Sequence, residues 1–204
     1  HGSVVQANAA LNRGLYYKSE EGVYVCQYFD SDCEAVIYEK KIWIKQRRRM
    51  HTECCGYVNK PESMEIVFDV ESPEENELEL FFRIPAWCKN NYRVFLNGDE
   101  IDPKPDKGFV KIKRGWKKDQ VILALERKIY VERLPGNEKM VAFLDGPEVL
   151  AGLTKDERTL YGDVNHPEKM IVPECDREWE QWISNYRIEG QKKGIRFVPI
   201  RQIG

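Results

Sequence analysis

The stretch Tyr92-Arg-Val-Phe-Leu-Asn-Gly-Asp-Glu-Ile101 decides the fold class of this chain. An Asn-Gly pair between two runs of strand-forming residues is the strongest short-range signal of a two-residue β-hairpin. The pair Asn97-Gly98 therefore predicts a strand over residues 92–96 and a short partner strand near Glu100 and Ile101.

Alternation with a period of two predicts further strands on both sides of this hairpin. They cover residues 23–28, 35–46 (a strand or a hairpin), 64–70, 78–84, 108–113, 120–125, 140–144 and 194–200. Pro199 places the last strand at a sheet edge or a strand end. Strands of five to seven residues, about ten residues apart and without helical segments between them, predict an all-β fold. We expect an antiparallel β-sandwich, either one or two packed modules.

Two segments depart from this strand pattern. Ser3 with Gln6 forms a capping box, and Val4, Ala7 and Leu11 follow at helical spacing, so a short helix is predicted before Gly14. Residues 163–182 carry prolines and many charges, which predicts a long connection or short irregular pieces. The expected organisation is a helix within residues 1–19, a first β-sandwich over 20–130 and a second, smaller β region over 131–204.

Composition excludes several classes of protein. The 204 residues hold 32 Lys plus Arg against 34 Asp plus Glu, so the basic face that a nucleic-acid partner requires is not expected. No run of about 18 apolar residues predicts a membrane span, and no signal-peptide pattern opens the chain. The six cysteines (Cys26, Cys33, Cys54, Cys55, Cys88 and Cys175) are too sparse for a disulfide scaffold. We therefore expect reduced thiols and a cytoplasmic location.

The segment from His51 to Cys55 holds four residues that can bind zinc: His51, Glu53, Cys54 and Cys55. A tetrahedral zinc site needs ligands that converge from one side. In an extended segment successive side chains point to opposite faces, so the two thiols would diverge. We expect a loop whose thiols pack, and a zinc-binding protein remains an alternative.

Five tryptophans raise the alternative of a carbohydrate-binding module, because aromatic rings can stack on sugars. Trp179 and Trp182 lie three residues apart beside acidic residues and are the better candidates for an exposed patch. Trp43 follows the strand alternation and is expected in the core or on a sheet face. For Trp87, Trp116 and the others, packing in the core is the competing interpretation.

Six segments, in this order, resemble one family. They are Gly22-Val-Tyr-Val-Cys-Gln-Tyr28, Arg83-Ile-Pro-Ala-Trp87, Val94-Phe-Leu-Asn-Gly98, Gly108-Phe-Val-Lys-Ile-Lys-Arg-Gly-Trp116, Val141-Ala-Phe-Leu-Asp-Gly-Pro-Glu-Val-Leu-Ala151 and Arg196-Phe-Val-Pro-Ile200. Together they resemble the region after the catalytic domain in the β-L-arabinofuranosidase family, glycoside hydrolase family 127.

The resemblance implies a large helical catalytic domain followed by β-sandwich modules. In the family the active site resembles a zinc-held cysteine cluster with a Cys nucleophile and a Glu acid/base. Its last two ligands are an adjacent Cys pair before the final helix of that domain, and this helix corresponds to Ser3–Tyr17 here. Cys54-Cys55 lies inside the sandwich and does not match that pair. No catalytic, cofactor-binding or metal residue is therefore assigned, and no cofactor is expected.

The function that the resemblance implies is a non-catalytic C-terminal β-sandwich module of a glycoside hydrolase. Its expected partner is the helical catalytic domain of the same parent chain, which it would brace. Whether the chain itself has activity stays open at this point, although inactivity is expected. Self-association through an uncovered apolar face is also expected, whereas nucleic acid and membrane partners are not.

Overall fold

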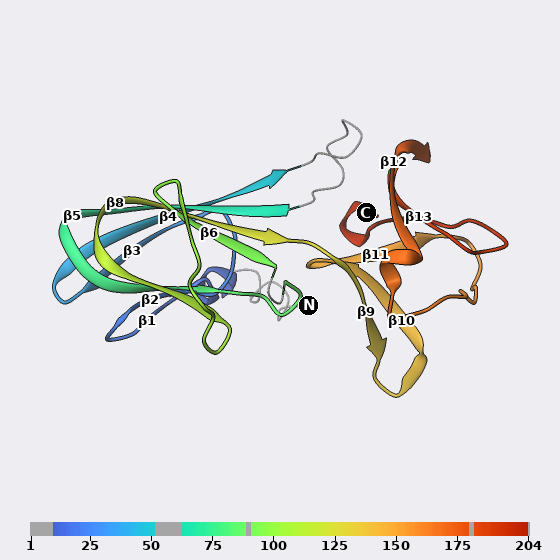
Figure 1. Ribbon diagram of the computed structural model, residues 1–204, viewed down its shortest axis with the longest axis horizontal. Helices are drawn as coiled ribbons and strands as arrows, with labels where there is room; N and C mark the ends of the chain where they lie inside the picture. Colours follow the sequence, from blue (N-terminus) through green and yellow to red (C-terminus); the bar gives the residue numbers. More distant parts are fainter. Residues whose placement is uncertain (1–9, 52–62, 89–90, 180–181, 204) are drawn as a thin grey trace. The chain divides into compact units, whose positions relative to one another are not determined.

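The computed structural model describes residues 10–51, 63–88, 91–179 and 182–203 (Figure 1). They fall into two compact units. One contains the residues up to Arg49 together with Met64–Leu125, and the other contains the chain from Glu126 onward. Each unit is built on one β-sheet, and in the described residues helices occur only as short 3-10 turns. The prediction of an all-β fold is confirmed.

The first unit is an eight-stranded sheet. Along its main path the strand order is β1-β2-β5-β8-β6-β7, and β4 joins β5 to β3. The strands are β1 (Tyr16–Lys18), β2 (Gly22–Val25), β3 (Ser31–Ile37), β4 (Lys40–His51), β5 (Ser63–Arg83), β6 (Tyr92–Leu96), β7 (Asp99–Ile101) and β8 (Phe109–Glu126).

Strands β5 and β8 are long and bend strongly (Figure 1). The early part of β5 lies beside β4, where the Ser72 hydroxyl donates to the carbonyl of Lys41 at 2.7 Å. Its later part pairs with β2 instead, with Leu80 opposite Val23. The bends fold one sheet into two layers, one with β3, β4, β6 and β7 and the other with β1 and β2. The resulting sandwich encloses the larger core.

The sequence predicted two separate strands where each of β5 and β8 is one. Residues 71–77, Glu-Ser-Pro-Glu-Glu-Asn-Glu, have the composition of a turn. Here that composition forms the bend instead: Ser72 and Asn76 face inward while Pro73 and the glutamates are exposed. The missing N–H of Pro73 is tolerated because regular pairing changes partner at this point.

One pairing is parallel, which departs from the expected antiparallel sandwich. Gly22 lies opposite Glu79 in the β2–β5 ladder. Between these two strands the chain makes the β3–β4 hairpin in the other layer and then returns along β5. The bend in β5 brings its second half beside β2 in the same direction.

The core of the first unit draws on both layers. Ile42 and Ile44 of β4 are buried on one face, as the alternation predicted. Phe68 and Phe82 come from the two halves of β5 and stand 4.7 Å apart between ring centroids. Trp116 of β8 is fully buried, and its indole N–H donates to the carbonyl of Leu78 at 3.0 Å. The hydrogen bond satisfies the one polar group of this side chain.

Two tight turns join strands of this unit. Asn97 and Gly98 have φ values of 53° and 94°, so the predicted two-residue hairpin between β6 and β7 is confirmed. The β3–β4 hairpin turns at Tyr38 and Glu39, which also have positive φ values of 49° and 65°. Neither residue type favours that conformation, so residues 35–46 were predicted only as a strand or a hairpin.

In the described residues the N-terminal helical segment ends at Gly14, before the Tyr17 that the resemblance implied, and Ala10 is helical. Leu11–Gly14 forms a 3-10 turn and Tyr16–Lys18 forms strand β1. The backbone N–H of Cys26 donates to the carbonyl of Leu15 at 2.8 Å, and Tyr17 pairs with Tyr24. Strand pairing and the β propensity of tyrosine override the helical spacing. Residues 3–9 of the predicted helix lie outside the described residues.

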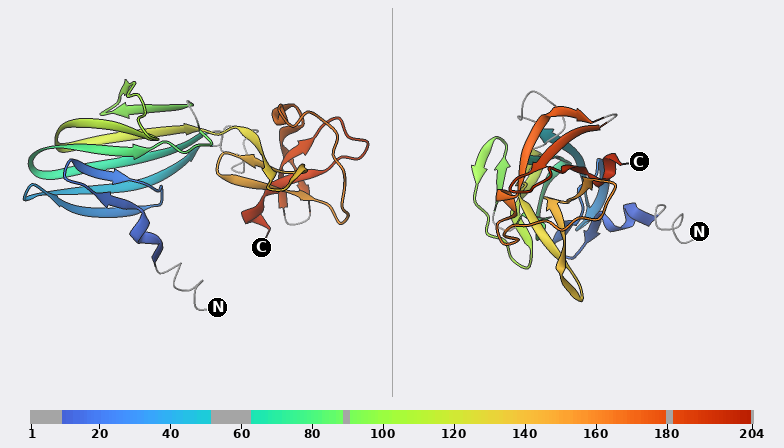
Figure 2. Two further views of the ribbon diagram at one scale, coloured as in Figure 1. Left: turned by 90° about the horizontal axis from the view of Figure 1, so that it is seen from below. Right: turned by 90° about the vertical axis from the view of Figure 1, so that its right-hand side faces the viewer.

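The second unit is a six-stranded sheet in the order β12-β13-β14-β11-β10-β9. Its strands are β9 (Ile129–Leu134), β10 (Asn137–Asp145), β11 (Glu148–Leu153), β12 (Ile171–Trp179), β13 (Trp182–Ile188) and β14 (Arg196–Pro199). A separate core packs Phe143, Ile171, Tyr186 and Phe197 together. Figure 2 shows this unit from two further sides.

The prediction of an irregular connection over residues 163–182 is confirmed for residues 163–170, which form turns and the 3-10 turn Pro167–Lys169, and is wrong for the second half of the segment, where β12 lies. β12 is an edge strand, and its ladder with β13 shifts register between Pro173 and Arg177. Edge strands and bulges are the places where a sheet accepts proline and charged residues. The prolines and charged residues of this segment are the reason why the sequence did not predict the strand.

Candidate functional site

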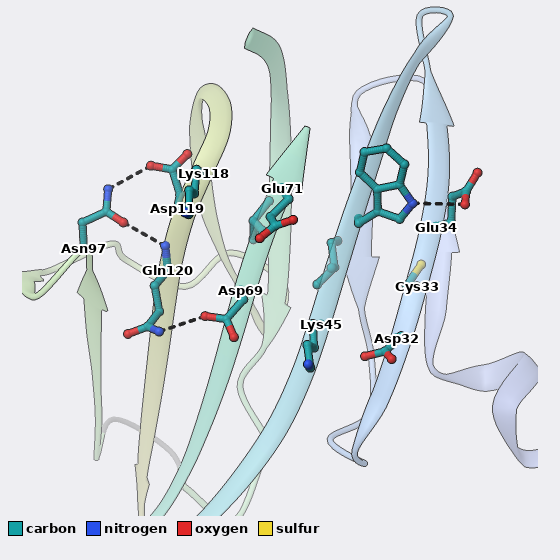
Figure 3. Close-up of a pocket in the computed structure, with 13 residues that line it drawn as sticks. Asp32, Cys33, Glu34, Lys45, Asp69, Glu71, Asn97, Lys118, Asp119 and Gln120 are labelled. Atoms are coloured by element: carbon teal, nitrogen blue, oxygen red, sulfur yellow. Dashed lines mark hydrogen bonds between the residues drawn. The ribbon is translucent and has the colours of Figure 1, made fainter. Parts of the chain in front are cut away.

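The outer face of the β3–β4–β5–β8–β6 layer carries a polar groove of about 790 Å³. Alternation along the strands produces it, because the residues next to the core positions of β4, β5 and β8 point outward. Figure 3 shows the polar side chains that line it, and they come from β3, β4, β5, β8 and the β6–β7 turn.

Trp43 lines one part of this groove. Its neighbours Ile42 and Ile44 are buried, so its own side chain lies on the outer face and is 37 % exposed. The indole N–H donates to Glu34 at 3.1 Å, and Lys41 forms an ion pair with the same carboxylate at 3.1 Å. The hydrogen bonds from Lys41 and Trp43 lower the pKa of Glu34. Trp43 therefore occupies a sheet face, one of the two positions expected for it.

A chain of amide and carboxylate groups lines the opposite part of the groove (Figure 3). The Asn97 side-chain amide donates to Asp119 at 2.8 Å, and the Gln120 backbone N–H donates to the Asn97 oxygen at 2.8 Å. The Gln120 side-chain amide then donates to Asp69 at 2.8 Å. These hydrogen bonds fix four polar side chains across β5, β8 and the β6–β7 turn. In the sequence Asn97 was read only as a turn residue, because pairing between distant strands carries no local signal.

The groove carries charges of both signs. Its charged lining residues are five carboxylates (Asp32, Glu34, Asp69, Glu71 and Asp119) and two lysines (Lys45 and Lys118). Three of the carboxylates are held in ion pairs: Asp32 with Arg47 at 2.9 Å, Glu34 with Lys41 at 3.1 Å and Asp119 with Arg114 at 3.1 Å. Such a surface has no dominant charge and offers hydrogen-bond acceptors to hydroxyl groups.

The other layer of the sandwich presents an aromatic stripe, which we define as Tyr17, Tyr24, Phe81 and Phe109. Tyr17 pairs with Tyr24, and Tyr24 pairs with Phe81, across strands β1, β2 and β5. The rings of Tyr24 and Phe81 stack with centroids 4.0 Å apart, and Phe109 of β8 meets Tyr24 edge-on at 5.3 Å. Tyr17 is 57 % exposed, Tyr24 and Phe109 are half-buried, and Phe81 is buried. Four neighbouring strands thus present aromatic side chains on one outer face.

The residues of the zinc alternative are not brought together in the described part of the chain. His51 is the last residue of β4, while Glu53, Cys54 and Cys55 lie outside the described residues. Among residues 10–51, 63–88, 91–179 and 182–203, no three His, Cys, Asp or Glu side chains are arranged to hold a metal ion.

The remaining tryptophans differ in their surroundings. Trp116 is buried and Trp87 packs against the same core. The backbones of Trp179 and Trp182 pair at the end of the β12–β13 hairpin, but their side chains lie outside the described part of the structure. Of the tryptophan side chains that the structure describes, Trp43 is the one exposed on a sheet face.

The described cysteines have the environment of inert thiols. Cys26 and Cys33 are free thiols. Burial raises the pKa of Cys26 and of Cys33, so both side chains stay protonated near neutral pH. Cys88 is buried, and its thiol donates to the carbonyl of Asn91 at 2.7 Å. None of the three has the activated thiolate that nucleophilic catalysis requires.

The second unit holds a charge cluster, which we define as Arg127, Asp145, Glu148, Tyr186 and Arg201; Arg127, Asp145 and Tyr186 are buried, whereas Arg201 is exposed. The Arg127 guanidinium forms ion pairs with Asp145 at 3.1 Å and Glu148 at 2.8 Å. The Tyr186 hydroxyl donates to Asp145, and burial together with that carboxylate raises the pKa of Tyr186 far above its usual value. Arg201 binds Glu148 from the other side. The cluster ties β10, β11 and β13 together.

A sandwich folded from one bent sheet, followed by a second β unit, defines this chain as an all-β region of the type found beside catalytic domains. The family description that matches residues 22–127, just over half of the chain, is "Beta-L-arabinofuranosidase, GH127 middle domain". The chain belongs to this family, and the resemblance seen in the sequence is confirmed.

Solved structures support the same fold. A GH127 β-L-arabinofuranosidase from Geobacillus stearothermophilus T6 matches 97 % of this chain with a TM-score of 0.64 and 18 % identity. A GH127 β-arabinofuranosidase matches 67 % of the chain (TM-score 0.53, 23 % identity, 23 % of its own length), and a further glycoside hydrolase matches 91 % (TM-score 0.56, 18 % identity, 34 % of its own length).

The chain covers only part of these proteins. It spans 34 % of the length of the Geobacillus enzyme. No curated protein is detectably similar to this sequence. In the described residues, no helix has the length and apolar character needed to cross a membrane.

Proposed function

We propose that this chain is a non-catalytic β region that braces the helical catalytic domain of a GH127-type glycoside hydrolase. The match to a middle domain and the 34 % share of the Geobacillus enzyme support this proposal, because such a chain accompanies other domains. The described thiols also lack an activating environment. Activity on β-L-arabinofuranosides would then belong to the helical domain.

The aromatic stripe is the observation that carries the bracing role. Tyr24 and Phe81 form a flat stacked pair, and Tyr17 extends the stripe to the edge strand β1. Contiguous aromatic surface of this kind marks interaction sites, because leaving it in water is unfavourable. We assign this face to the contact with the helical domain.

Turnover of an aryl β-L-arabinofuranoside by the purified chain tests the non-catalytic part of the proposal. We expect no release of the aryl group above the uncatalysed rate. Activity that co-purifies with the chain through several columns would overturn the assignment.

The parent gene tests the domain assignment. We expect several hundred helix-patterned residues upstream of His1, ending in an adjacent Cys pair. A reading frame that starts at this chain without a helical region would contradict the bracing role. That the chain binds no metal, and that it is cytoplasmic, stay predictions from the sequence.

A further inference from the structure

The polar groove lies on the opposite layer from the aromatic stripe, so the proposed bracing contact does not use it. We propose that this groove binds a neutral oligosaccharide. The site is independent of the bracing role, because its residues lie on β3, β4, the early part of β5, the late part of β8 and the β6–β7 turn, whereas the stripe uses the other halves of β5 and β8.

The shape of the groove suits an extended ligand. It crosses the sheet from β3 through β4, β5 and β8 to the turn after β6, four strand spacings of about 4.8 Å, which gives a length of roughly 19 Å. A second hollow of about 440 Å³, lined by Glu71, Lys117 and Lys118, adjoins it. Trp43 lines both hollows, so its ring lies where they meet. Several linked sugar rings fit along such a path.

Trp43 provides the stacking platform. Its side chain is exposed on the outer face, and the hydrogen bond from its ring edge to Glu34 fixes the orientation of the indole. Lys41 holds Glu34 from the other side. An aromatic ring fixed in this way binds the C–H face of a sugar without first losing side-chain entropy.

The amide and carboxylate row provides the hydroxyl contacts. One oxygen of Asp69 accepts a hydrogen bond from the Gln120 side chain. Asn97 accepts from the backbone N–H of Gln120 and donates to the side chain of Asp119, so it holds both neighbouring residues in place. The second Asp69 oxygen and the Gln120 amide oxygen take part in no hydrogen bond among the described residues. Oriented acceptors of this kind can take paired hydroxyl donors from a sugar ring.

The charge balance of the groove favours a neutral ligand. Asp32, Glu34 and Asp119 are held in ion pairs by Arg47, Lys41 and Arg114. The other two carboxylates of the lining, Asp69 and Glu71, are balanced by Lys45 and Lys118, so no excess charge attracts a polyanion or a polycation. The carboxylates are spread over β3, β5 and β8 rather than converging, and they form no metal cluster in the described residues. A neutral, hydroxyl-rich ligand is the class that both the platform and the polar row accept.

Affinity electrophoresis of the whole chain through gels that contain a soluble polysaccharide tests the proposal. The panel is arabinan, arabinoxylan and galactomannan as neutral polymers, with polygalacturonate as the acidic one. We expect at least one neutral polymer to retard the chain and polygalacturonate to leave its mobility unchanged. Calorimetry with oligosaccharides of the retarding polymer then gives the affinity.

Variants locate the site. Trp43→Ala is expected to weaken binding about tenfold and Trp43→Phe much less, because the ring contact contributes most of that difference. Asp69→Asn keeps the shape of the side chain and is expected to weaken binding several-fold. Tyr161→Ala, at an exposed aromatic residue of the second unit, is the matched control and should bind like the unaltered chain.

Three outcomes would overturn the proposal. They are no retardation by any neutral polymer, retardation by polygalacturonate alone, or full affinity in both Trp43→Ala and Asp69→Asn. If Trp43→Ala fails to fold, as judged by circular dichroism, the Asp69→Asn and Trp43→Phe titrations decide the question. The outcome is separate from the activity assay, which tests whether the chain is catalytic.

Discussion

Single residues of the charge cluster determine how substitutions affect the stability of the second unit. Arg127 is almost completely buried and balances two carboxylates, yet its Nε and Nη1 atoms have no hydrogen-bond partner among the described residues. Tyr186 adds a neutral hydrogen bond to Asp145. Removing one partner of an ion pair in this cluster therefore lowers the free energy of unfolding, because an unpaired charge would be left in the interior.

Replacing Arg127 with methionine is expected to destabilise the chain by about 3 kcal/mol, because the Asp145 carboxylate loses its buried cation. The double variant Arg127→Met with Asp145→Asn is expected to recover part of this loss, since no unpaired carboxylate then remains at position 145. Urea unfolding measures both. A single variant as stable as the unaltered chain would contradict this interpretation of the cluster.

Glu148 predicts an acid-dependent loss of stability. Burial opposes its ionisation, but the hydrogen bonds from Arg201 and Arg127 outweigh burial and lower the pKa of its carboxyl group. A lowered pKa in the folded state stabilises the fold above the unfolded value of about 4.3, and this contribution disappears as the pH falls through the folded pKa. We expect the urea concentration at the unfolding midpoint to decrease as the pH is lowered below about 4. Glu148→Gln should show a shallower fall over the same range, and an identical pH profile would refute the assignment.

At the scale of the elements, the parallel ladder between β2 and β5 depends on a close backbone approach. A Cβ atom added at Gly22 would lie 1.8 Å from the carbonyl oxygen of Glu79. Backbone atoms cannot move away without separating the two strands, so the side chain of any other residue strains the ladder.

Gly22→Ala is expected to lower the free energy of unfolding by about 2–3 kcal/mol, in the range of overpacked interiors. Gly194→Ala is the control, because a Cβ there meets no heavy atom within 4 Å and its change should stay within about 0.5 kcal/mol. Thermal unfolding followed by circular dichroism compares the two. Equal effects would show that the close approach does not limit the ladder.

The elements also show what the sequence could predict. Alternation located the strands around Ile42, Phe68 and Leu123, and the Asn97-Gly98 pair located a hairpin, because both signals are local. The continuity of β5 through residues 71–77, and the strand β12 around Pro173, depend on pairing partners far away in the chain. Local composition at those places favours turns, so tertiary pairing overrode it.

For the candidate sites too, the sequence singled out individual residues but could not predict which of them lie together. The sequence offered Trp43 as a core or sheet-face residue but gave no reason to connect it with Asp69, Asn97 and Gln120. Their shared groove arises from the order of β4, β5, β8 and β6 in one layer, which no spacing along the chain encodes. The aromatic stripe likewise needs the register of Tyr17, Tyr24 and Phe81.

At the scale of the whole molecule, the uncovered aromatic stripe predicts self-association of the isolated chain. Tyr17 lies on the edge strand β1 and Tyr24 on the adjacent strand β2, where a second copy can reach them. Light scattering should show a mass that rises with protein concentration. Replacing both tyrosines with serine should keep the chain monomeric, and a concentration-independent monomer in the unaltered chain would contradict the prediction.

The near-neutral composition of the molecule, with a formal net charge of −2, is consistent with a region whose interactions lie in local surfaces rather than in its overall charge. The stripe and the groove lie on opposite layers of one sandwich. A domain bound at the stripe therefore leaves the groove open.

The most direct test of the account is calorimetric titration of this chain with the separately produced helical domain of its parent enzyme. We predict one-to-one binding that is lost when Tyr24 and Phe109 are both replaced by serine and retained when Trp43 is replaced by alanine. Absence of binding by the unaltered chain, or binding that survives the stripe substitutions, would contradict the claim that this β region braces a catalytic domain through its aromatic face.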